Sequence, residues 1–487
     1  MVPARADIVV VGGGSAGCTL AATLVAERPG RTVLVLESGA GYTSIATAPA
    51  EILDPMRLPV GPESACAAEY PVILGRRSGT IARGRVLGGS GAVNGGYFVR
   101  ARPEDFDAWP SSWSFDDVLP NFRAIESDAD FDDDWHGVSG PVPVARTPWD
   151  RLHPVARAFH EAALAAGHAA VDDLNAPGPA GVGRVPLNIA NGLRTGPSLS
   201  FLVPALDSPN LTVCTNAHVR RIVMSGGAAV GVEVDDGRRV ATVEAGDIVL
   251  CAGAIESPRL LMLSGLGPAD ELRRLGIEPV LDLPGVGRGF SDHPEVAVPY
   301  RYRTEMRSPA PVLETVLHTG ELEFRPYTSP FADSVPGSGA DLPVLGVVLT
   351  RPHSRGRLLF DAGDPAAAPV VDYGYLADPR DRAAMRDGVA SAVGLLSSMR
   401  DVVDTGSIGA DAAGVDDAWL DAHLGTSQHL SGSCRMGSGD RAVVDDRCRV
   451  RGAERLFVVD TSVFPQVPSR GPHATVVMLA QRVAAFV

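Results

Sequence analysis

The chain has 487 residues, of which 45% are hydrophobic and 21% are charged, a balance typical of a folded globular protein. Its formal net charge of −15 argues against a nucleic-acid partner, because phosphate backbones attract basic surfaces. The six cysteines lie far apart and lack the spacing of a metal site or of a small disulfide scaffold. We therefore expect buried or incidental thiols and no bound metal.

The first apolar run, residues 8–11, is short and is followed by glycines, so it predicts a strand rather than a signal sequence. No stretch of about 18 consecutive apolar residues occurs, and the sequence therefore predicts no membrane span. The apolar segment 475–487 favours a core helix, with a helix on a membrane surface as the alternative. We expect a soluble cytoplasmic protein, or one peripheral to the membrane.

Residues 7–39 predict a strand, a glycine turn, a helix and a second strand, which together form a βαβ unit. Gly12, Gly14 and Gly17 fill the glycine positions of a dinucleotide-binding turn, and Glu37 follows about twenty residues later, where a carboxylate would meet ribose hydroxyls. This unit alone fits NAD as well as FAD. Glu37 disfavours the 2′-phosphate of NADP.

Later segments predict further parts of the same domain. The short alternating runs between residues 219 and 243 are broken by Gly226-Gly227 and by Asp235-Asp236-Gly237, a pattern typical of an inserted β-meander. Residues 247–253 predict a strand that runs into a helix, and residues 455–460 predict a terminal buried strand. Residues 300–420 are rich in proline and aspartate, and we assign most of them to a second domain over the reactive end of the cofactor.

Two segments, 84–101 and 253–267, are rich in glycine, which lets a ligand come close to the backbone. They also carry small hydroxyl and amide side chains. Such surfaces suit a flat cofactor with polar edges. Both segments resemble, position by position, the two signature motifs of the glucose–methanol–choline (GMC) oxidoreductases. Residues 136–141, 283–294 and 443–465 are similar to other segments of that family in the same order, so the resemblance covers essentially the whole chain.

The resemblance implies an α/β fold with a Rossmann-like FAD-binding domain, an inserted β-meander and a sheet-based substrate (cap) domain. We predict that the FAD-binding domain comprises residues 1–135, 190–298 and 425–487, and that the cap comprises residues 136–189 and 299–424.

The same resemblance implies that the cofactor is FAD. Some family members attach the flavin to a histidine just before the asparagine of the first signature. Here that position is Val93, so we expect non-covalent FAD. The expected cofactor-binding residues are Gly12, Gly14, Ser15, Ala16, Gly17, Glu37, Ser38, Arg85, Gly89, Ser90, Asn94, Gly95, Val219, Ala252, Gly253, Asp460 and Thr461, with Ala254 nearby.

The segment 429–436 resembles the family motif whose histidine is the catalytic base, which assigns that role to His429. Histidine suits the role because its ordinary pKa of about 6.5 lets it exchange a proton near neutral pH. The family places a second histidine or asparagine where this chain has Gly471. We take His473 as the second active-site residue; Arg470 and a merely supporting role for His473 are the alternatives.

The resemblance implies oxidation of an alcohol to an aldehyde or ketone by hydride transfer to flavin N5, with oxygen, a quinone or a protein as the electron acceptor. The segment 467–472 is also similar to mycofactocin-associated GMC proteins, which would make reduced mycofactocin the donor and the respiratory chain the destination of its electrons. Two alternatives stay open: a flavin-containing lyase, and a non-catalytic flavin module for electron transfer.

Overall fold

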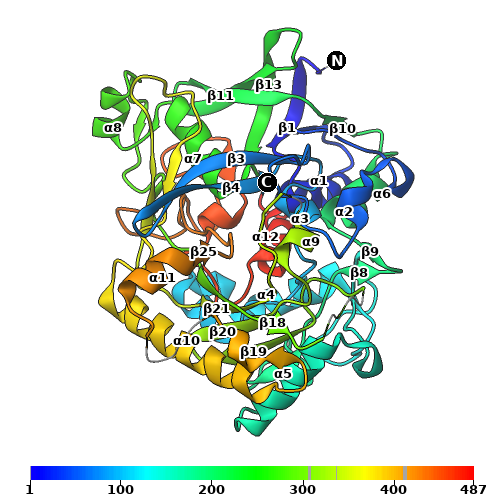
Figure 1. Cartoon of the computed structure of the whole chain (residues 1–487). Coiled ribbons are helices and arrows are strands. Elements are labelled where there is room, and N and C mark those ends of the chain that lie inside the picture. Colours follow the sequence, from blue (N-terminus) through cyan, green and yellow to red (C-terminus); the bar gives the residue numbers. More distant parts are fainter. Residues whose placement is uncertain (1, 305, 307–308, 336, 410–413) are drawn as a thin grey trace.

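The computed structural model describes residues 2–304, 306, 309–335, 337–409 and 414–487. A seven-stranded sheet lies at one end of the molecule, at the top of Figure 1. Its central strands pair in parallel and are apolar and buried, as expected for a sheet covered on both faces. The strands are β10 (Leu211–Cys214), β2 (Val33–Leu36), β1 (Arg5–Val11), β13 (Val240–Leu250), β12 (Ala228–Asp235) and β11 (His218–Ser225), with β26 (Leu456–Val458) also on β13.

The predicted βαβ unit is present as β1, helix α1 (Ser15–Glu27) and β2. The turn between β1 and α1 needs glycine for two reasons. Gly12 has a φ of 101°, and a Cβ there would lie 2.6 Å from the Cys251 carbonyl oxygen. A Cβ on Gly17 would collide with the Gly12 carbonyl oxygen, so glycine allows α1 to pack directly on the strand.

The predicted β-meander is formed by β11, β12 and β13, which pair antiparallel in sequence order. Gly226 and Gly227 both have positive φ, which gives the first hairpin the twist of a tight primed turn. Strand β13 then extends into the parallel region and leads to helix α7 (Gly253–Leu263), as the sequence predicts.

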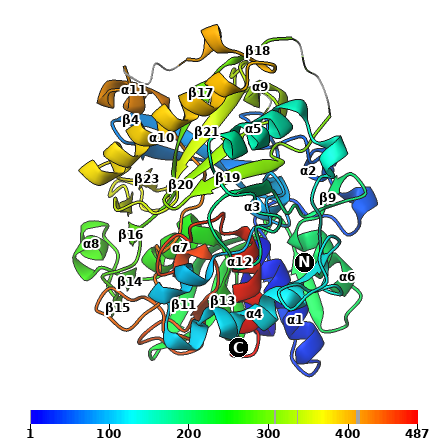
Figure 2. The ribbon, with the colours of Figure 1, turned by 90° about the horizontal axis from the view of Figure 1, so that it is seen from below.

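A six-stranded antiparallel sheet lies at the other end of the molecule, and helices α5 (Pro154–Ala165) and α10 (Pro379–Ser398) pack on it (Figure 2). Its strands come from distant parts of the chain. In spatial order they are β25 (Leu424–Thr426), β17 (Pro294–Pro299), β21 (Val344–Leu349), β20 (Leu322–Pro326), β19 (Thr315–Thr319) and β7 (Val182–Arg184).

A third sheet, which the sequence does not predict, joins an early hairpin to late strands. It consists of β16 (Arg288–Phe290), β22 (Gly356–Leu359), β23 (Val370–Asp372), β3 (Ala67–Leu74) and β4 (Arg77–Gly84). Further helices are α4 (Phe115–Ile125), α8 (Ala269–Arg274) and α11 (Asp417–His423). Within the described ranges, none of the helices combines the length and the apolar character that a membrane crossing needs.

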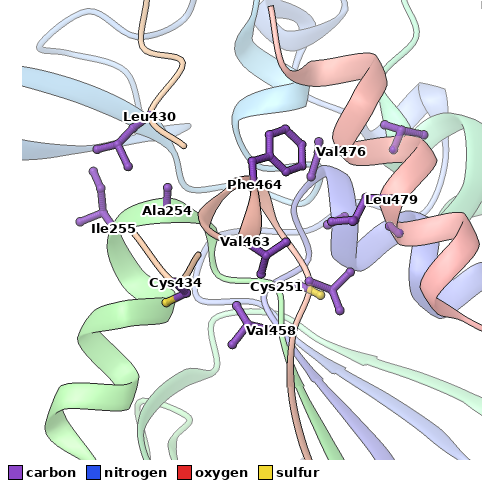
Figure 3. Packing of buried hydrophobic residues seen from close by; sticks show 14 of the residues in the cluster. Cys251, Ala254, Ile255, Leu430, Cys434, Val458, Val463, Phe464, Val476 and Leu479 are labelled. Atoms are coloured by element: carbon purple, nitrogen blue, oxygen red, sulfur yellow. The ribbon is translucent and has the colours of Figure 1, made fainter. Parts of the chain in front are cut away.

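Helix α12 (His473–Val483) lies in the middle of the molecule and packs on α1 and α4 (Figure 1). It is a buried core helix, which is the favoured prediction for the segment 475–487. Figure 3 shows Val476 and Leu479 of this helix among side chains from α7 and from residues 430–464. This shared core fixes the C-terminal motifs against the seven-stranded sheet.

Candidate active site

A cavity of about 450 Å³ opens at the carboxyl ends of β1, β2 and β13, the usual ligand-binding edge of such a sheet. Most of the predicted cofactor-binding residues line it. They are Gly12, Gly14, Ser15, Ala16, Glu37, Ser38, Arg85, Gly89, Ser90, Val219, Ala252, Gly253, Asp460 and Thr461, together with Ala254.

The cavity has the construction that an FAD molecule needs. Gly89 and Gly14 bring two glycine turns into contact across it, since a Cβ on Gly89 would lie 2.8 Å from the Gly14 Cα. Backbone N–H groups at the start of α1 border the cavity, where they would meet the phosphates of a bound dinucleotide, and Arg85 adds positive charge. Glu37 also lines the cavity, where its carboxylate accepts hydrogen bonds from the backbone N–H groups of Gly13 and Gly39. These residues fit the ADP half of FAD.

Three predicted residues do not line this cavity. Gly17 serves the packing of α1 described above. Asn94 accepts a hydrogen bond from the Gly96 backbone N–H through Oδ1, and its amide donates to Nδ1 of His473 over 3.0 Å. Gly95 lies beside Leu58.

The sequence also missed several residues that line the cavity. Arg83 and Tyr70 come from the β3–β4 hairpin, and His218, Glu256 and Arg259 come from β11 and α7. Glu256 and Arg259 lie within the second signature segment, 253–267, whereas no motif marks Tyr70, Arg83 or His218. Only the third sheet, which brings the hairpin over the cavity, places Arg83 and Tyr70 there.

Asp460 joins the second signature to the C-terminal segment. Its carboxylate accepts hydrogen bonds from the Gly253 backbone N–H, the Ser257 hydroxyl and the Ser462 backbone N–H. Ser433, in the motif of the predicted base, donates its hydroxyl hydrogen bond to the Ala254 carbonyl over 2.6 Å. The loop that carries the base is therefore tied to the start of α7.

His429 and His293 face each other through their Nδ1 atoms, which lie 2.9 Å apart. The two rings are nearly perpendicular, with an interplanar angle of 85°. Within the ranges that the structure describes, the His429 ring makes its hydrogen bond through Nδ1 and none through Nε2. One ring nitrogen of His429 is thus fixed by its neighbour, and the other is free for a ligand.

The backbone around this histidine pair is held by a buried carboxylate. One oxygen of Asp292 accepts hydrogen bonds from the backbone N–H groups of His293 and His429, over 2.6 and 2.9 Å. Gln428 adopts a φ of 60°, which is rare for a residue with a side chain, and Arg83 donates to its carbonyl over 2.6 Å. These contacts set the direction in which the His429 ring leaves the chain.

Burial governs the protonation of this site. It holds the pKa of His429 well below its usual range, and the nearby His293 and Arg325 act in the same direction. Burial lowers the pKa of His293 to about 3 and raises that of Asp292 to about 7. Both imidazoles are therefore neutral at physiological pH.

The side chain of Tyr97 lies against Gly471, the position where the family places its second active-site residue. A Cβ on Gly471 would lie 3.0 Å from Cδ1 of Tyr97 and 3.5 Å from Cε1 of His429. The Tyr97 hydroxyl donates to Glu323 of β20 over 2.9 Å. His473, the predicted second residue, lies at the start of α12, where it contacts Asn94 and packs edge-on against Phe98. Arg470, the alternative, is buried near Glu323.

Comparisons with known proteins agree with this architecture. The N-terminal and C-terminal models of the GMC oxidoreductases match residues 6–295 and 352–480. An uncharacterized GMC-type oxidoreductase of Rhodococcus erythropolis is 51% identical over 486 residues, which cover 99% of this chain and 98% of that protein. The oxygen-dependent choline dehydrogenase of Brucella suis is 32% identical over 524 residues, which cover 98% and 94%.

The fold of the chain is also similar to that of solved structures. The crystal structure of pyridoxine 4-oxidase from Mesorbium loti superposes with a TM-score of 0.89 at 30% identity, covering 99% of each chain. A formate oxidase structure reaches the same TM-score at 24% identity, covering 100% of this chain and 98% of its own, and shows the shared fold.

Proposed function

The chain belongs to the GMC oxidoreductase family, an FAD-dependent family that acts on CH–OH groups, and on this premise we propose that His429 is its catalytic base. FAD, when bound, supplies the two-electron acceptor for the alcohol. The residues lining the cavity at the ends of β1, β2 and β13 hold its nucleotide part. His429 then takes the proton of the substrate hydroxyl at Nε2.

The His293–His429 hydrogen bond is the observation that carries this proposal. Two neutral imidazoles that meet through Nδ1 share one proton between those atoms. Because a base needs a free lone pair, we assign the shared proton to Nδ1 of His429. Nδ1 of His293 is then the acceptor, and Nε2 of His429 keeps the lone pair that takes the substrate proton.

The experiment that tests this role compares wild-type protein with the His429→Ala variant in anaerobic flavin reduction by an alcohol. Removal of a general base costs about 10²–10⁴-fold in rate, so the variant retains FAD and loses most of its reduction rate. A variant with unchanged reduction would show that another group takes the proton. Equal FAD content in the two proteins is the control for folding.

The donor and the physiological acceptor are a further part of the proposal. The resemblance of residues 467–472 to mycofactocin-associated proteins makes reduced mycofactocin one donor to test beside simple alcohols and sugars. Oxygen, a quinone and a protein are the acceptors to compare in the reoxidation step. The donor that reduces the flavin fastest identifies the substrate class.

The two rival functions give different results in the same experiment. A lyase on this scaffold would leave the flavin oxidised with every alcohol, whereas an oxidoreductase bleaches it. A module for electron transfer alone would keep its partner affinity when His429 is replaced, and it would show no alcohol-dependent reduction to lose.

A further inference from the structure

Arg470 is a buried cation whose hydrogen-bonding groups are unused. Its side chain is 3% exposed, and its Nε atom is buried with no hydrogen-bond partner. Among the residues that the structure describes, none accepts a hydrogen bond from its guanidinium; the nearest carboxylate oxygen, Oε2 of Glu323, is 4.0 Å from Nη1. Burial of an unsatisfied charged donor is costly, so such a group indicates an acceptor that a ligand supplies.

The carboxylates near Arg470, in contrast, already accept hydrogen bonds from other side chains. Glu323 accepts hydrogen bonds from Nε of Arg325 at one oxygen and from the Tyr97 hydroxyl at the other. Glu295 accepts from the Tyr327 hydroxyl over 2.7 Å and, at its second oxygen, from Arg325. Arg325 contacts both carboxylates and Arg470 lies 4.0 Å from Glu323, so the two guanidiniums together balance the two carboxylates and leave no net negative charge for a cationic substrate.

The charged side chains around Arg470 belong to the surroundings of His429, the proposed base. Gly471, the residue after Arg470, faces both the Tyr97 ring and the His429 imidazole, since a Cβ there would lie within 3.5 Å of each. Ser427, two residues before His429, accepts a hydrogen bond from Arg325 over 2.9 Å. The Tyr97 hydroxyl donates to the same Glu323 oxygen that lies 4.0 Å from Nη1 of Arg470, and the Tyr97 ring lies beside Gly471 and His429, so one tyrosine and one carboxylate connect the unsatisfied guanidinium to the proposed base.

We propose that Arg470 binds an acceptor oxygen of the substrate, and that the substrate is an alcohol carrying a carboxylate or carbonyl oxygen close to its carbinol carbon. This inference rests on the proposed alcohol oxidation. Guanidinium groups bind such oxygens through planar, charge-assisted hydrogen bonds, with a carboxylate as the strongest partner. A quaternary ammonium alcohol is excluded as the preferred substrate, because it would meet Arg470 and find no free carboxylate.

The first test is a substrate panel for anaerobic flavin reduction by the wild-type holoenzyme. It compares a 2-hydroxy acid, the matching 2-hydroxy amide, a simple alcohol of equal chain length, and choline. We expect the acid and the amide to give the higher kcat/KM values. A preference for the acid identifies a carboxylate as the partner, and equal rates identify a carbonyl oxygen. A preference for choline or for the simple alcohol overturns the inference.

The second test uses the Arg470→Met and Arg470→Lys variants. Loss of a hydrogen bond to a charged group lowers kcat/KM by roughly 10- to 150-fold, so Arg470→Met should show this loss for the preferred substrate and less than about 3-fold for the simple alcohol. Arg470→Lys should recover part of it. Arg351→Met is the matched control, because Arg351 is half-exposed and lies 3.5 Å from Asp105 of the same region.

A binding readout makes the inference independent of turnover. Titration with the alkyl carboxylate that lacks the hydroxyl group should perturb the flavin absorbance of wild-type protein and leave that of Arg470→Met unchanged. Equal titrations in both proteins overturn the role of Arg470. If no alcohol reduces the flavin while the carboxylate still binds through Arg470, the proposed oxidation is wrong and the anion site stands.

Discussion

The ring of Tyr97 occupies the space into which a side chain at Gly471 would project. The two ring atoms nearest to a Cβ at that position, Cδ1 and Cε1, would lie 3.0 and 3.1 Å from it. Glu323 holds the ring through the Tyr97 hydroxyl. The absence of a side chain at position 471 therefore makes room for the Tyr97 ring beside His429.

This relationship predicts that the two positions depend on each other. Gly471→Asn should lower kcat/KM at least tenfold, because its side chain meets the Tyr97 ring and displaces either that ring or the loop before α12. Tyr97→Ala should also reduce activity, since it leaves a void beside His429. The double variant should lose less than the sum of the two single losses in free energy. Additive losses would show that the two side chains act separately.

The pH dependence of kcat/KM should report the buried environment of His429. A base must be neutral to take a proton, so activity is lost as pH falls through its pKa. Burial holds that pKa well below 6.5, and the proposed base therefore remains active across the range where an exposed histidine titrates. We expect no loss of kcat/KM through His429 between pH 8 and pH 6, measured with a substrate that does not itself ionise there. Because burial raises the pKa of Asp292 to about 7, the profile is compared with that of Asp292→Asn, and an inflection near pH 6.5 that persists in this variant would contradict the prediction.

His293 should act as a positioning residue for His429. Replacement by leucine removes the acceptor of the His429 Nδ1 proton and lets that proton move to Nε2, which disables the base. We expect His293→Leu to reduce kcat by about 10²–10⁴-fold with FAD content unchanged. His293→Asn offers an amide oxygen at a similar position and should recover part of the rate. Similar rates in both variants would indicate a purely packing role.

The βαβ unit and its ligand edge could be predicted from sequence because the information is local. The apolar run, the glycine spacing and Glu37 lie within 33 consecutive positions, 7–39, and each has a steric or hydrogen-bonding reason. The environment of the base could not be predicted in this way. His293 and His429 are 136 residues apart, and Tyr97 and Glu323 are 226 residues apart. No periodicity in the sequence fixes such a pairing; the six-stranded sheet does.

His136 illustrates the same limit. Next to glycine and a run of aspartates, its position in the sequence is typical of a surface turn. In the structure its ring is buried and lies 3.0 Å from Glu126 and 2.8 Å from Asp173. The aspartates at 132–134 do form an exposed turn, whereas the ring packs inward against partners that lie on either side along the chain.

The flavin should be released on denaturation. Val93, at the position where some relatives attach the cofactor, is a buried aliphatic side chain at the end of the short helix α3 (Ser90–Val93). Cys251 lines the cavity, and burial raises the pKa of its thiol well above the usual range, so it is a poor nucleophile. Acid precipitation should give a colourless pellet and a yellow supernatant with the mass of FAD. Colour retained in the pellet would contradict non-covalent binding.

The buried charges around His136 predict a stability that declines at alkaline pH. Glu126, Asp128 and His136 converge closely enough to hold a metal ion, but Arg100 already pairs with Glu126 and Arg146 with Asp128. Burial by itself lowers the pKa of His136, and hydrogen bonds to the surrounding carboxylates outweigh it and raise the pKa to about 11. A protonated imidazole, rather than a metal, therefore completes the cluster.

Because the folded-state pKa of His136 lies above its unfolded value of about 6.5, its contribution to stability is complete below pH 6.5 and falls as pH rises toward 11. The His136→Gln variant should accordingly lose more thermal stability relative to wild type at pH 6 than at pH 9, measured as the difference in Tm at fixed ionic strength. A chelator should leave the Tm of wild-type protein unchanged, since the two guanidiniums and the imidazolium already pair with the carboxylates of Glu126, Asp128 and Asp173. A Tm difference that grows with pH, or a Tm that falls with the chelator, would show that the cluster is held together in another way.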